Sequence, residues 1–186
     1  MASSSTSTSD RSVYDVFLNH RGPDVKKTLA SQIYHRLTER GVRVFFDIEE
    51  MQVGEELTTQ IKDVIQTASV HVAIFSPGYA NSRWCLDELL LMLETEKTII
   101  PTFYDVSPSD LRHARERQAR EGVYARILSI LQCILQCTCG EDQGGYAGAL
   151  RMLEKTPRYD SNIIENWRKA LSSAAKLSGF EHKSNR

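Results

Sequence analysis

Two segments of the chain combine side chains that could bind phosphate or supply a working carboxylate. The first, Asn19–Asp24, places an arginine, a glycine and an acidic residue directly after an apolar run. Arg21 could hold a pyrophosphate with help from backbone N–H groups at the start of a following helix. Arg21 could equally pair with Asp24 or Asp15 and only fix the loop, and the residues alone do not decide between these two interpretations.

The second segment is a predicted helix that begins near Ser82 and is apolar on two opposite sides. Trp84, Glu88 and Leu91 lie on one side of the helical wheel. The opposite stripe, which is expected to face the core, consists of Leu86, Leu89, Leu90 and Leu93. A helix buried on both sides would hold Glu88 beside Trp84 in a partly dry cleft, where loss of water raises the pKa of a carboxyl group. Asp87 lies about 100° away and is expected to face solvent, while the pattern alone favours an exposed, ion-paired Glu88.

Alternating strands and helices must position these two segments. Apolar runs rich in β-branched residues predict four strands, Val13–Leu18, Val42–Phe46, Val70–Phe75 and Thr98–Tyr104. Pro101 in the last run indicates a bend or an edge strand. Strands separated by helices favour a parallel sheet covered on both faces, with ligands bound beyond the carboxyl ends of the strands. The three loops expected at that edge are Asn19–Asp24, Asp47–Gly54 and Ser76–Ser82.

The predicted helices connect those strands and close the chain. Their expected ranges are Asp24–Arg40, Glu55–Thr67, a helix from Ser82, Gly122–Gln136 and Asn162–Leu177. Gly41 suits the position after a helix C-terminus, and the Ser82 hydroxyl suits an N-cap. In the closing helix, the expected buried stripe is Ile164, Trp167, Leu171 and Ala174. The glycine-rich stretch 139–148 is predicted to be a mobile loop.

Composition limits the class of protein. With 186 residues, 41% hydrophobic and 25% charged, the chain suits one packed domain, and its formal net charge of −1 gives no general drive toward nucleic acid or anionic membrane. Residues 1–11 lack the basic and apolar regions of a secretory signal and are expected to be a disordered leader. Without export, the four cysteines are not expected to form disulfides, and a fourth zinc ligand beside Cys133, Cys137 and Cys139 is missing. We therefore expect no bound metal and no membrane span.

Five segments resemble, in the same order, the sequence boxes of plant TIR (Toll/interleukin-1 receptor) domains. They are DVFLNHRGPD at 15–24, DIEEMQVGEEL at 47–57, SRWCLDEL at 82–89, PTFYDVSPSD at 101–110 and the closing WRKAL to GF at 167–180. The third segment matches the SxWCLxEL signature at every specified position. The resemblance covers nearly the whole chain and implies a flavodoxin-like α/β fold, with a five-stranded parallel sheet and helices on both faces. The TIR domain would span 12–180, followed by a C-terminal tail at 181–186.

The resemblance also implies which residues form the site. Plant TIR domains cleave NAD, and their catalytic glutamate is the one in the signature, here Glu88. The residues that would shape the nucleotide pocket are Asn19, His20, Arg21, Gly22, Asp24, Gly54 and Trp84. The chain departs from the usual first box, because Asn19 and His20 replace Ser-Phe and Pro23 replaces Glu. These departures bear on the pocket and on the products, and they leave Glu88 in place.

The activity implied is that of an NAD+ hydrolase or ADP-ribosyl cyclase, which releases nicotinamide and gives ADP-ribose or cyclic ADP-ribose isomers as signals in plant innate immunity and cell death. One carboxylate suffices, because nicotinamide leaves as a neutral base, whereas the leaving oxygen in ordinary glycosidases needs a proton. NAD+ would be the substrate, and no prosthetic group is expected. The resemblance further implies a TIR-only protein, in the cytoplasm with the nucleus as an alternative. It would act through TIR–TIR self-association and through lipase-like immune regulators that sense its products.

Two alternative functions remain open. A TIR domain can act as a non-catalytic adaptor by self-association alone, although the presence of Glu88 weighs against this. Action on nucleic acid is suggested by a cluster of arginines, Arg112, Arg115, Arg117, Arg120 and Arg126. Glu116 and Glu121 interleave with these arginines, which favours a solvated helix face instead. Redox and thiol chemistry are not indicated, because no G-x-G-x-x-G follows a predicted strand and Cys85 has no clear histidine partner.

Overall fold

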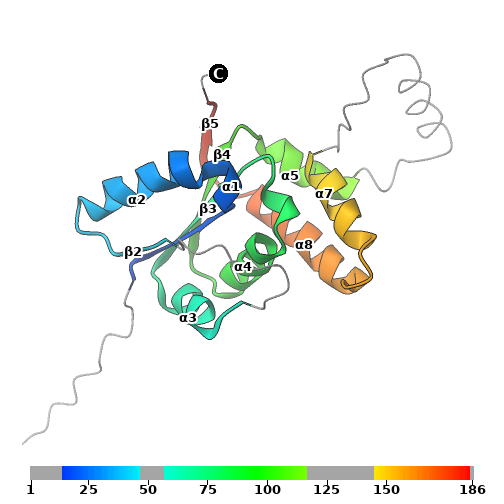
Figure 1. The fold of residues 1–186 in the computed structure, drawn as a ribbon, viewed down its shortest axis with the longest axis horizontal. Coiled ribbons are helices and arrows are strands. Elements are labelled where there is room, and N and C mark those ends of the chain that lie inside the picture. The colour runs from blue at the N-terminus through cyan, green and yellow to red at the C-terminus, as the bar shows by residue number, and fades with distance from the viewer. Residues whose placement is uncertain (1–13, 47–56, 117–144, 185–186) are drawn as a thin grey trace, which may run out of the picture.

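The computed structural model describes residues 14–46, 57–116 and 145–184, and a five-stranded parallel sheet forms its centre (Figure 1). The strands are β1 (Val16–His20), β2 (Val44–Phe45), β3 (Val70–Phe75), β4 (Thr98–Tyr104) and β5 (Phe180–His182). Their order across the sheet is β2-β1-β3-β4-β5, and every neighbouring pair is parallel. The chain therefore winds outward in both directions from β1 and β3, and the crevice beyond these strands is the topological switch point. The predicted fold class is confirmed.

The three inner strands, β1, β3 and β4, are longer than the two edge strands. β3 and β4 have the predicted bounds, and β3 is buried over residues 71–75. β1 starts at Val16 and runs on through Asn19 and His20, which pair with β3, so the expected polar loop begins inside the sheet. β2 is shorter than predicted and consists of Val44–Phe45 alone.

Of the two interpretations of Pro101, a bend or an edge strand, the edge strand is wrong. β4 lies between β3 and β5, and Pro101 aligns with Ala73 of β3. The Asp105 N–H points toward β5 and donates to His182 O at 2.9 Å. Backbone nitrogens two residues apart in a strand face the same side, so the nitrogen of Pro101, four residues earlier, also faces β5. β5 begins only at Phe180, opposite the residue after Pro101, and no ladder partner is lost through the missing N–H.

The helical segment after β1 is not the single helix predicted for Asp24–Arg40. It consists of α1 (Gly22–Val25), a π-helical turn η1 (Lys26–Ala30) and α2 (Ser31–Thr38). Thr28 has non-helical backbone angles (φ −125°, ψ −108°), and these separate the two α-helical parts. Gly41 ends the segment as predicted, with a φ of +78°. Its N–H donates to Thr38 O (2.9 Å) and the next N–H to Leu37 O (3.1 Å), which is a Schellman motif.

The remaining helical elements of the described residues follow β2. They are α3 (Thr59–Thr67), a 3₁₀ turn η2 (Tyr79–Asn81), α4 (Arg83–Glu94), α5 (Pro108–Glu116), α7 (Gly145–Glu154) and α8 (Ser161–Ala174). α3 begins after the predicted Glu55, because Thr58 caps it by accepting from Ile61 N (3.3 Å). The predicted cap of α4 is confirmed, since Ser82 Oγ accepts from Cys85 N at 3.4 Å.

The end of the chain confirms one prediction and changes two. α8 buries the predicted stripe, which consists of Ile164, Trp167, Leu171 and Ala174. α7 includes residues 145–148, so the second part of the glycine-rich stretch is helical rather than a loop. β5 reaches His182, within the segment 181–186 that was expected to be a tail. The predicted helix Gly122–Gln136 and the predicted leader 1–11 lie outside the described residues.

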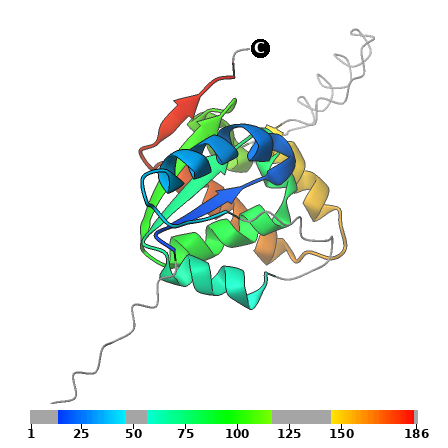
Figure 2. The same ribbon diagram turned by 60° about the vertical axis from the view of Figure 1, so that its left-hand side comes forward.

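Helices cover both faces of the sheet, and each face has its own core (Figure 2). On one face, Val25 of α1 and Ala30 of η1 are fully buried against side chains of the inner strands. On the other face, α3, α4, α7 and α8 enclose the larger core, where Phe17, Phe75 and Trp167 are buried. β1 contributes to both cores because successive side chains of a strand point to opposite faces.

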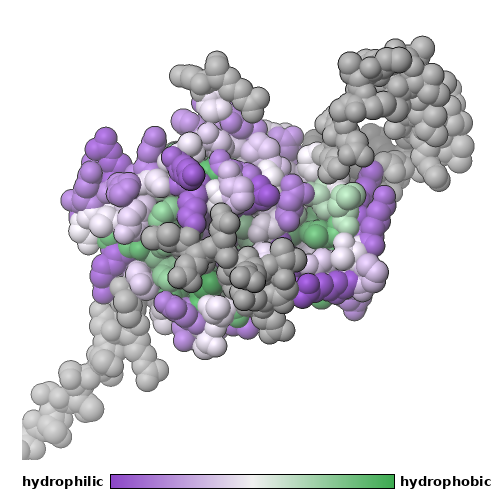
Figure 3. Space-filling model, viewed as in Figure 1, coloured by the Kyte–Doolittle hydropathy of each residue, from purple (hydrophilic) through white to green (hydrophobic). Residues whose placement is uncertain are grey.

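The surface of the described residues is mainly polar. Figure 3 shows hydrophilic residues over most of one face, with hydrophobic residues in smaller patches between them. The large apolar side chains that are exposed are Met152, Ile163, Leu177 and Phe180. Within the ranges that the structure describes, no helix has the length and apolar character needed to cross a membrane.

Candidate functional site

Two groups of polar side chains meet at the carboxyl ends of β1 and β3. One group centres on Glu88 of α4 and includes Asn19 from the end of β1. The other centres on Asp24 of α1 and includes Ser76 from the turn after β3. Both groups lie at the switch point, where sheets of this kind bind their ligands. Two of the three predicted loops are therefore found at this edge, and the third, Asp47–Gly54, lies outside the described residues.

Glu88 is held by a chain of hydrogen bonds that runs into the core. Asn19 Nδ2 donates to Glu88 Oε2 at 2.6 Å, and the Tyr79 hydroxyl donates to Asn19 Oδ1 at 2.5 Å. The same hydroxyl lies 2.9 Å from the backbone oxygen of Cys85. Asn19 and Tyr79 are fully buried, whereas Glu88 is half-buried. One oxygen of the carboxylate is thus tied to the sheet while the residue keeps some access to solvent.

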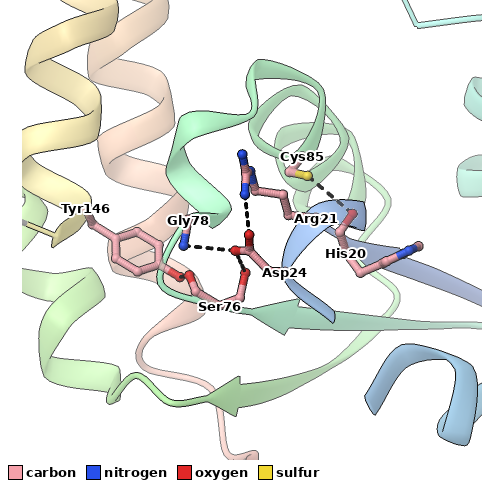
Figure 4. Close-up of polar contacts among 7 residues, drawn as sticks. All are labelled: His20, Arg21, Asp24, Ser76, Gly78, Cys85 and Tyr146. Carbon is pink, nitrogen blue, oxygen red and sulfur yellow. Dashed lines mark hydrogen bonds and ion pairs between the residues drawn. The ribbon is translucent and has the colours of Figure 1, made fainter. Parts of the chain in front are cut away.

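Asp24 gathers donors from two separate loops (Figure 4). Arg21 Nη1 forms an ion pair with Asp24 Oδ1. Ser76 Oγ (2.5 Å) and Gly78 N–H (3.0 Å) both donate to Asp24 Oδ2, which ties α1 to the turn after β3. Of the two interpretations of Arg21, the structure therefore contains the ion pair with Asp24. The other acidic candidate, Asp15, pairs instead with Arg43 at 2.7 Å.

Gly78 lies so close to Arg21 and Asp24 that a side chain at this position would force their polar ends to shift. A Cβ there would lie 2.8 Å from both Arg21 Nη1 and Asp24 Oδ2, closer than real Cβ contacts allow. The missing side chain lets the backbone N–H approach the carboxylate directly. Sequence reasoning identified Gly78 only as turn punctuation, because a contact with Asp24 across 54 residues leaves no local pattern.

Tyr146 of α7 also belongs to this network, and sequence reasoning missed it. Its hydroxyl donates to the backbone oxygen of Ser76 at 2.7 Å, and its ring is buried (Figure 4). The ring stacks against that of Tyr79, with centroids 6.5 Å apart and planes 25° apart. Tyr146 was assigned to a glycine-rich loop, and an aromatic residue between glycines was the only signal that could have distinguished it.

Cys85 lies between the two groups, in surroundings that disfavour a reactive thiolate. Its Sγ is 3.4 Å from His20 O, and the residue is buried. Burial raises the pKa of the Cys85 thiol well above its usual range, and the nearby Glu88 carboxylate adds to that effect. A thiol that stays protonated at neutral pH does not supply the thiolate that nucleophilic catalysis needs. Burial likewise raises the pKa of Tyr79, which keeps its hydroxyl as a hydrogen-bond donor.

The faces of α4 differ from the predicted wheel in two ways. The buried residues are Cys85, Leu86, Leu89 and Met92, so the core stripe is rotated, and Leu90 and Leu93 are only half-buried. The prediction that Asp87 faces solvent is wrong. Trp167 Nε1 of α8 donates to Asp87 Oδ1 at 2.9 Å, and burial raises the pKa of the Asp87 carboxyl. A helical wheel does not reveal which side of a helix a distant second helix will cover.

The other predicted pocket residues surround these groups. Trp84 is half-buried one turn before Glu88 on α4, with the Arg83 guanidinium 5.7 Å from its ring centre. The His20 ring packs against Phe46 with centroids 4.9 Å apart, and its Nδ1 lies 3.2 Å from Leu18 O. Gly22 begins α1, and Gly54 lies outside the described residues.

This arrangement can act on a positive charge that develops close to Glu88. A carboxylate with a fixed oxygen can orient hydroxyl groups and stabilise a cationic carbon in a transition state without reorganising. Arg21, which is one-quarter exposed at its side chain, is the positive group nearest to Asp24 at this edge. Among the residues that the structure describes, no three His, Cys, Asp or Glu side chains are grouped so that they could hold a metal ion.

A doubly wound α/β domain with a glutamate at its switch point is the class of protein that fold and site define. The sequence model of the TIR domain matches residues 13–123, and the chain belongs to the TIR domain family. Among solved structures, the TIR domains in "Structure of the activated Roq1 resistosome directly recognizing the pathogen effector XopQ" align with a TM-score of 0.66 at 31% identity. That alignment covers 90% of this chain and 87% of that one.

Several plant proteins are similar to the chain in sequence. The "Probable 2' cyclic ADP-D-ribose synthase BdTIR" of Brachypodium distachyon is 49% identical over 98 residues, which is 53% of this chain and 44% of that protein. The "TMV resistance protein N" of Nicotiana glutinosa is 32% identical over 94% of this chain and 13% of its own length. The "Disease resistance protein RPV1" of Vitis rotundifolia is 34% identical over 96% of this chain and 11% of its own length. The chain thus spans less than half the length of these curated relatives.

Proposed function

We propose that this chain cleaves the nicotinamide–ribose bond of NAD+ and that Glu88 is its catalytic carboxylate. The observation that carries the proposal is the 2.6 Å hydrogen bond from Asn19 to Glu88, which fixes a carboxylate oxygen at the switch point of the sheet. The name of the Brachypodium relative supports the substrate class, because a cyclic ADP-ribose forms from NAD+ by loss of nicotinamide.

One carboxylate is enough for this reaction. The bond from the ribose C1′ carbon to the nicotinamide nitrogen breaks, and its electron pair goes to the nitrogen, so a cationic pyridinium leaves as a neutral base. Positive charge then develops on the C1′ carbon and the ring oxygen, and Glu88 stabilises it while orienting the ribose hydroxyls. Water attacks C1′ and loses a proton to give ADP-ribose. A nucleophile from the adenosine part of the same molecule gives a cyclic isomer instead.

The pocket that binds the substrate is proposed to use the residues around Glu88. Trp84, one turn earlier on α4, offers an aromatic face beside the carboxylate. Arg21 and the start of α1 at Gly22 are candidates for the pyrophosphate, with Asp24 holding the guanidinium in place. His20 and Gly54 complete the proposed set, and His20 brings a titratable imidazole to the end of β1.

The substitution Glu88→Gln tests the catalytic assignment. It removes the negative charge and keeps the shape, so we expect nicotinamide release to fall by about a hundredfold or more. Release is measured from purified protein and NAD+ by chromatography, and mass spectrometry of the same samples identifies ADP-ribose or its cyclic isomers.

Glu94→Gln is the matched control, because Glu94 lies exposed at the other end of α4. We expect this variant to keep the wild-type rate. If Glu88→Gln releases nicotinamide as fast as Glu94→Gln does, the assignment of Glu88 is wrong. If the wild type releases none under any condition, a non-catalytic adaptor role replaces the proposal.

We further propose that the chain signals in plant defence and acts as a self-associated assembly. Similarity to two disease resistance proteins supports the biological setting. The match to TIR domains within a resistosome structure, over 90% of this chain, supports self-association. Lipase-like immune regulators that sense the nucleotide products are the proposed recipients of the signal.

A further inference from the structure

We infer that Asn19, itself held by Tyr79, is a positioning residue that fixes the orientation of the Glu88 carboxylate. The inference rests on the proposed function, since it assigns a role toward the proposed catalytic group. In this inference Asn19 contacts another side chain of the protein rather than the nucleotide. The inference also assigns a role to Tyr79, which the sequence pattern did not identify.

When Glu88 is ionised, the hydrogen-bonding groups around Asn19 allow only one orientation of the Asn19 side-chain amide. A carboxylate only accepts hydrogen bonds, so the group facing it at 2.6 Å must be the NH₂ of the Asn19 amide. The amide oxygen then faces Tyr79, whose hydroxyl has one hydrogen and two acceptors within reach, Asn19 Oδ1 at 2.5 Å and the Cys85 carbonyl at 2.9 Å. Reversing the amide would place its oxygen against the carboxylate, where two acceptors repel each other.

Rigid surroundings make this chain of contacts suitable for positioning. Asn19 lies in a strand and aligns with Ala73 of β3, and its side chain is fully buried. The Tyr79 ring is also fully buried and packs on Phe75 with centroids 4.8 Å apart. Groups on rigid elements with locked side chains hold a site to within a few tenths of an ångström. Glu88 therefore receives its orientation from the sheet, although it projects from a helix.

Asn19 is a buried neutral donor to Glu88, and titratable groups surround this pair. Burial raises the pKa values of Tyr79 and Cys85, and the negative charge of Glu88 raises them further, so both groups stay protonated at neutral pH. In the neighbouring group, the charge of Arg21 lowers the pKa of Cys85 and the charge of Asp24 raises it. A hydrogen bond from a neutral amide to a carboxylate stabilises the charged form. Loss of the Asn19 donor should accordingly change both the geometry and the titration of Glu88.

A double-mutant cycle on NAD+ cleavage tests whether Tyr79 acts through Asn19. Asn19→Leu keeps the size and removes the donor, so we expect kcat to fall about tenfold with little change in KM. Tyr79→Phe should lower kcat a few-fold, because the amide loses the contact that fixes its orientation. The double variant should be no slower than Asn19→Leu, since Tyr79 has nothing left to orient. Tyr159→Phe, at a ring that contacts Trp167, is the control and should match the wild type.

Additive losses in the cycle, or an Asn19→Leu variant with the wild-type kcat, would overturn the inference. A second measurement does not depend on activity. NMR titration of the Glu88 carboxyl carbon should show its pKa rise in Asn19→Leu and rise less in Tyr79→Phe, because the carboxylate loses a donor in the first variant and keeps a less well oriented one in the second. If Asn19→Leu does not fold, Asn19→Ser takes its place with the same expected direction. An unchanged pKa contradicts the positioning role, whereas an inactive wild type with the expected shift contradicts only the proposed function.

Discussion

His71 lies in the middle of β3, fully buried, with Nε2 2.8 Å from the backbone oxygen of Ile65. Burial lowers the pKa of its imidazole below the ordinary value of 6.5, and the positive charge of Lys97 lowers it further. The folded state therefore binds fewer protons at His71 than the unfolded state does. Stability from this group is complete above pH 6.5 and is lost as the pH falls from 6.5 through the folded pKa.

We predict that in His71→Gln the free energy of unfolding depends less on pH below pH 6.5 than it does in the wild type. Glutamine does not titrate, so the fall in the free energy of unfolding below pH 6.5 should be smaller in the variant than in the wild type. Urea unfolding at several pH values on both sides of 6.5 measures this difference. His35→Gln, at an exposed position on α2, is the matched control and should keep the wild-type slope. Equal slopes in all three proteins would contradict the prediction.

At the scale of residues, the sequence identified the proposed catalytic group more readily than the groups that hold it. Glu88 stands out because its signature is local and complete, whereas the pattern around it, taken alone, favoured a surface ion pair. Tyr79 is missed because its bond to Asn19 spans 60 residues. Asp87 is misplaced because its partner, Trp167, comes from a helix 80 residues later. Contacts between distant segments depend on the packed fold, and local spacing does not contain them.

β5 is held to the sheet by its pairing with β4 rather than by buried side chains. Its three side chains are all exposed, so burial does not hold it, and it pairs with β4 from Thr102 to Tyr104. Just before β5, a Cβ at Gly179 would lie only 2.1 Å from Pro101 O. Glycine therefore lets the chain cross close to β4 and enter the sheet.

We predict that Gly179→Ala detaches β5 while the rest of the sheet stays folded. The new methyl group cannot fit against the backbone of Pro101, and relief of an overpacked contact of this kind costs about 1–3 kcal/mol. Hydrogen exchange at the Asp105 amide, which donates to His182 O in the wild type, should become fast. Ser178→Ala, at the exposed neighbouring residue, should leave that exchange slow. Continued protection of the Asp105 amide in Gly179→Ala would contradict the prediction.

At the scale of elements, apolar content decides what could be predicted. The predicted bounds of β3 and β4 agree with the structure because both are mainly apolar, β-branched and aromatic segments between polar turns. β5 had no signal, since an exposed three-residue strand exists only through its pairing with β4. The break at Thr28 was missed for a related reason: periodic apolar residues continue across it, and the kink appears only in the backbone angles.

The whole molecule carries little net charge, and this favours contact between copies. A formal net charge of −1 gives weak repulsion between like molecules. Exposed apolar side chains on α7, α8 and β5, namely Met152, Ile163 and Phe180, offer surface that a second molecule could cover. These properties agree with the proposal that the chain acts as an assembly.

We predict that NAD+ cleavage per molecule rises steeply with protein concentration. An assembly dissociates by mass action on dilution, so specific activity should fall over a dilution of about a hundredfold. Light scattering on the same samples should show the molecular mass falling together with the activity. Crowding agents should restore both at a given concentration. Specific activity that stays flat over the dilution would contradict a requirement for self-association.

At the scale of the whole molecule, alternating strands and helices were enough to predict a parallel sheet covered on both faces and the edge that carries the candidate site, whereas the five-stranded flavodoxin-like fold was predicted from the family resemblance. The alternating elements were not enough to predict how the last part of the chain completes the domain. The match to the family's sequence model ends at residue 123 of this chain, yet Tyr146 and Trp167 are buried in the larger core. Tyr146 also bonds to the turn after β3, so a late segment supports an early one. The late helices complete the core through contacts between residues far apart in the sequence, which no local sequence pattern contains.

The five residues of β1 contribute both to the two cores and to the candidate site. Phe17 packs into one core and Leu18 into the other, while Asn19 reaches Glu88 and His20 meets Phe46. Under the proposed function, selection for folding and selection for activity therefore act on the same short stretch of the gene. Mutations that alter specificity can accumulate more freely in the turns that follow the strands, and β1 is expected to be among the slowest parts of the domain to evolve.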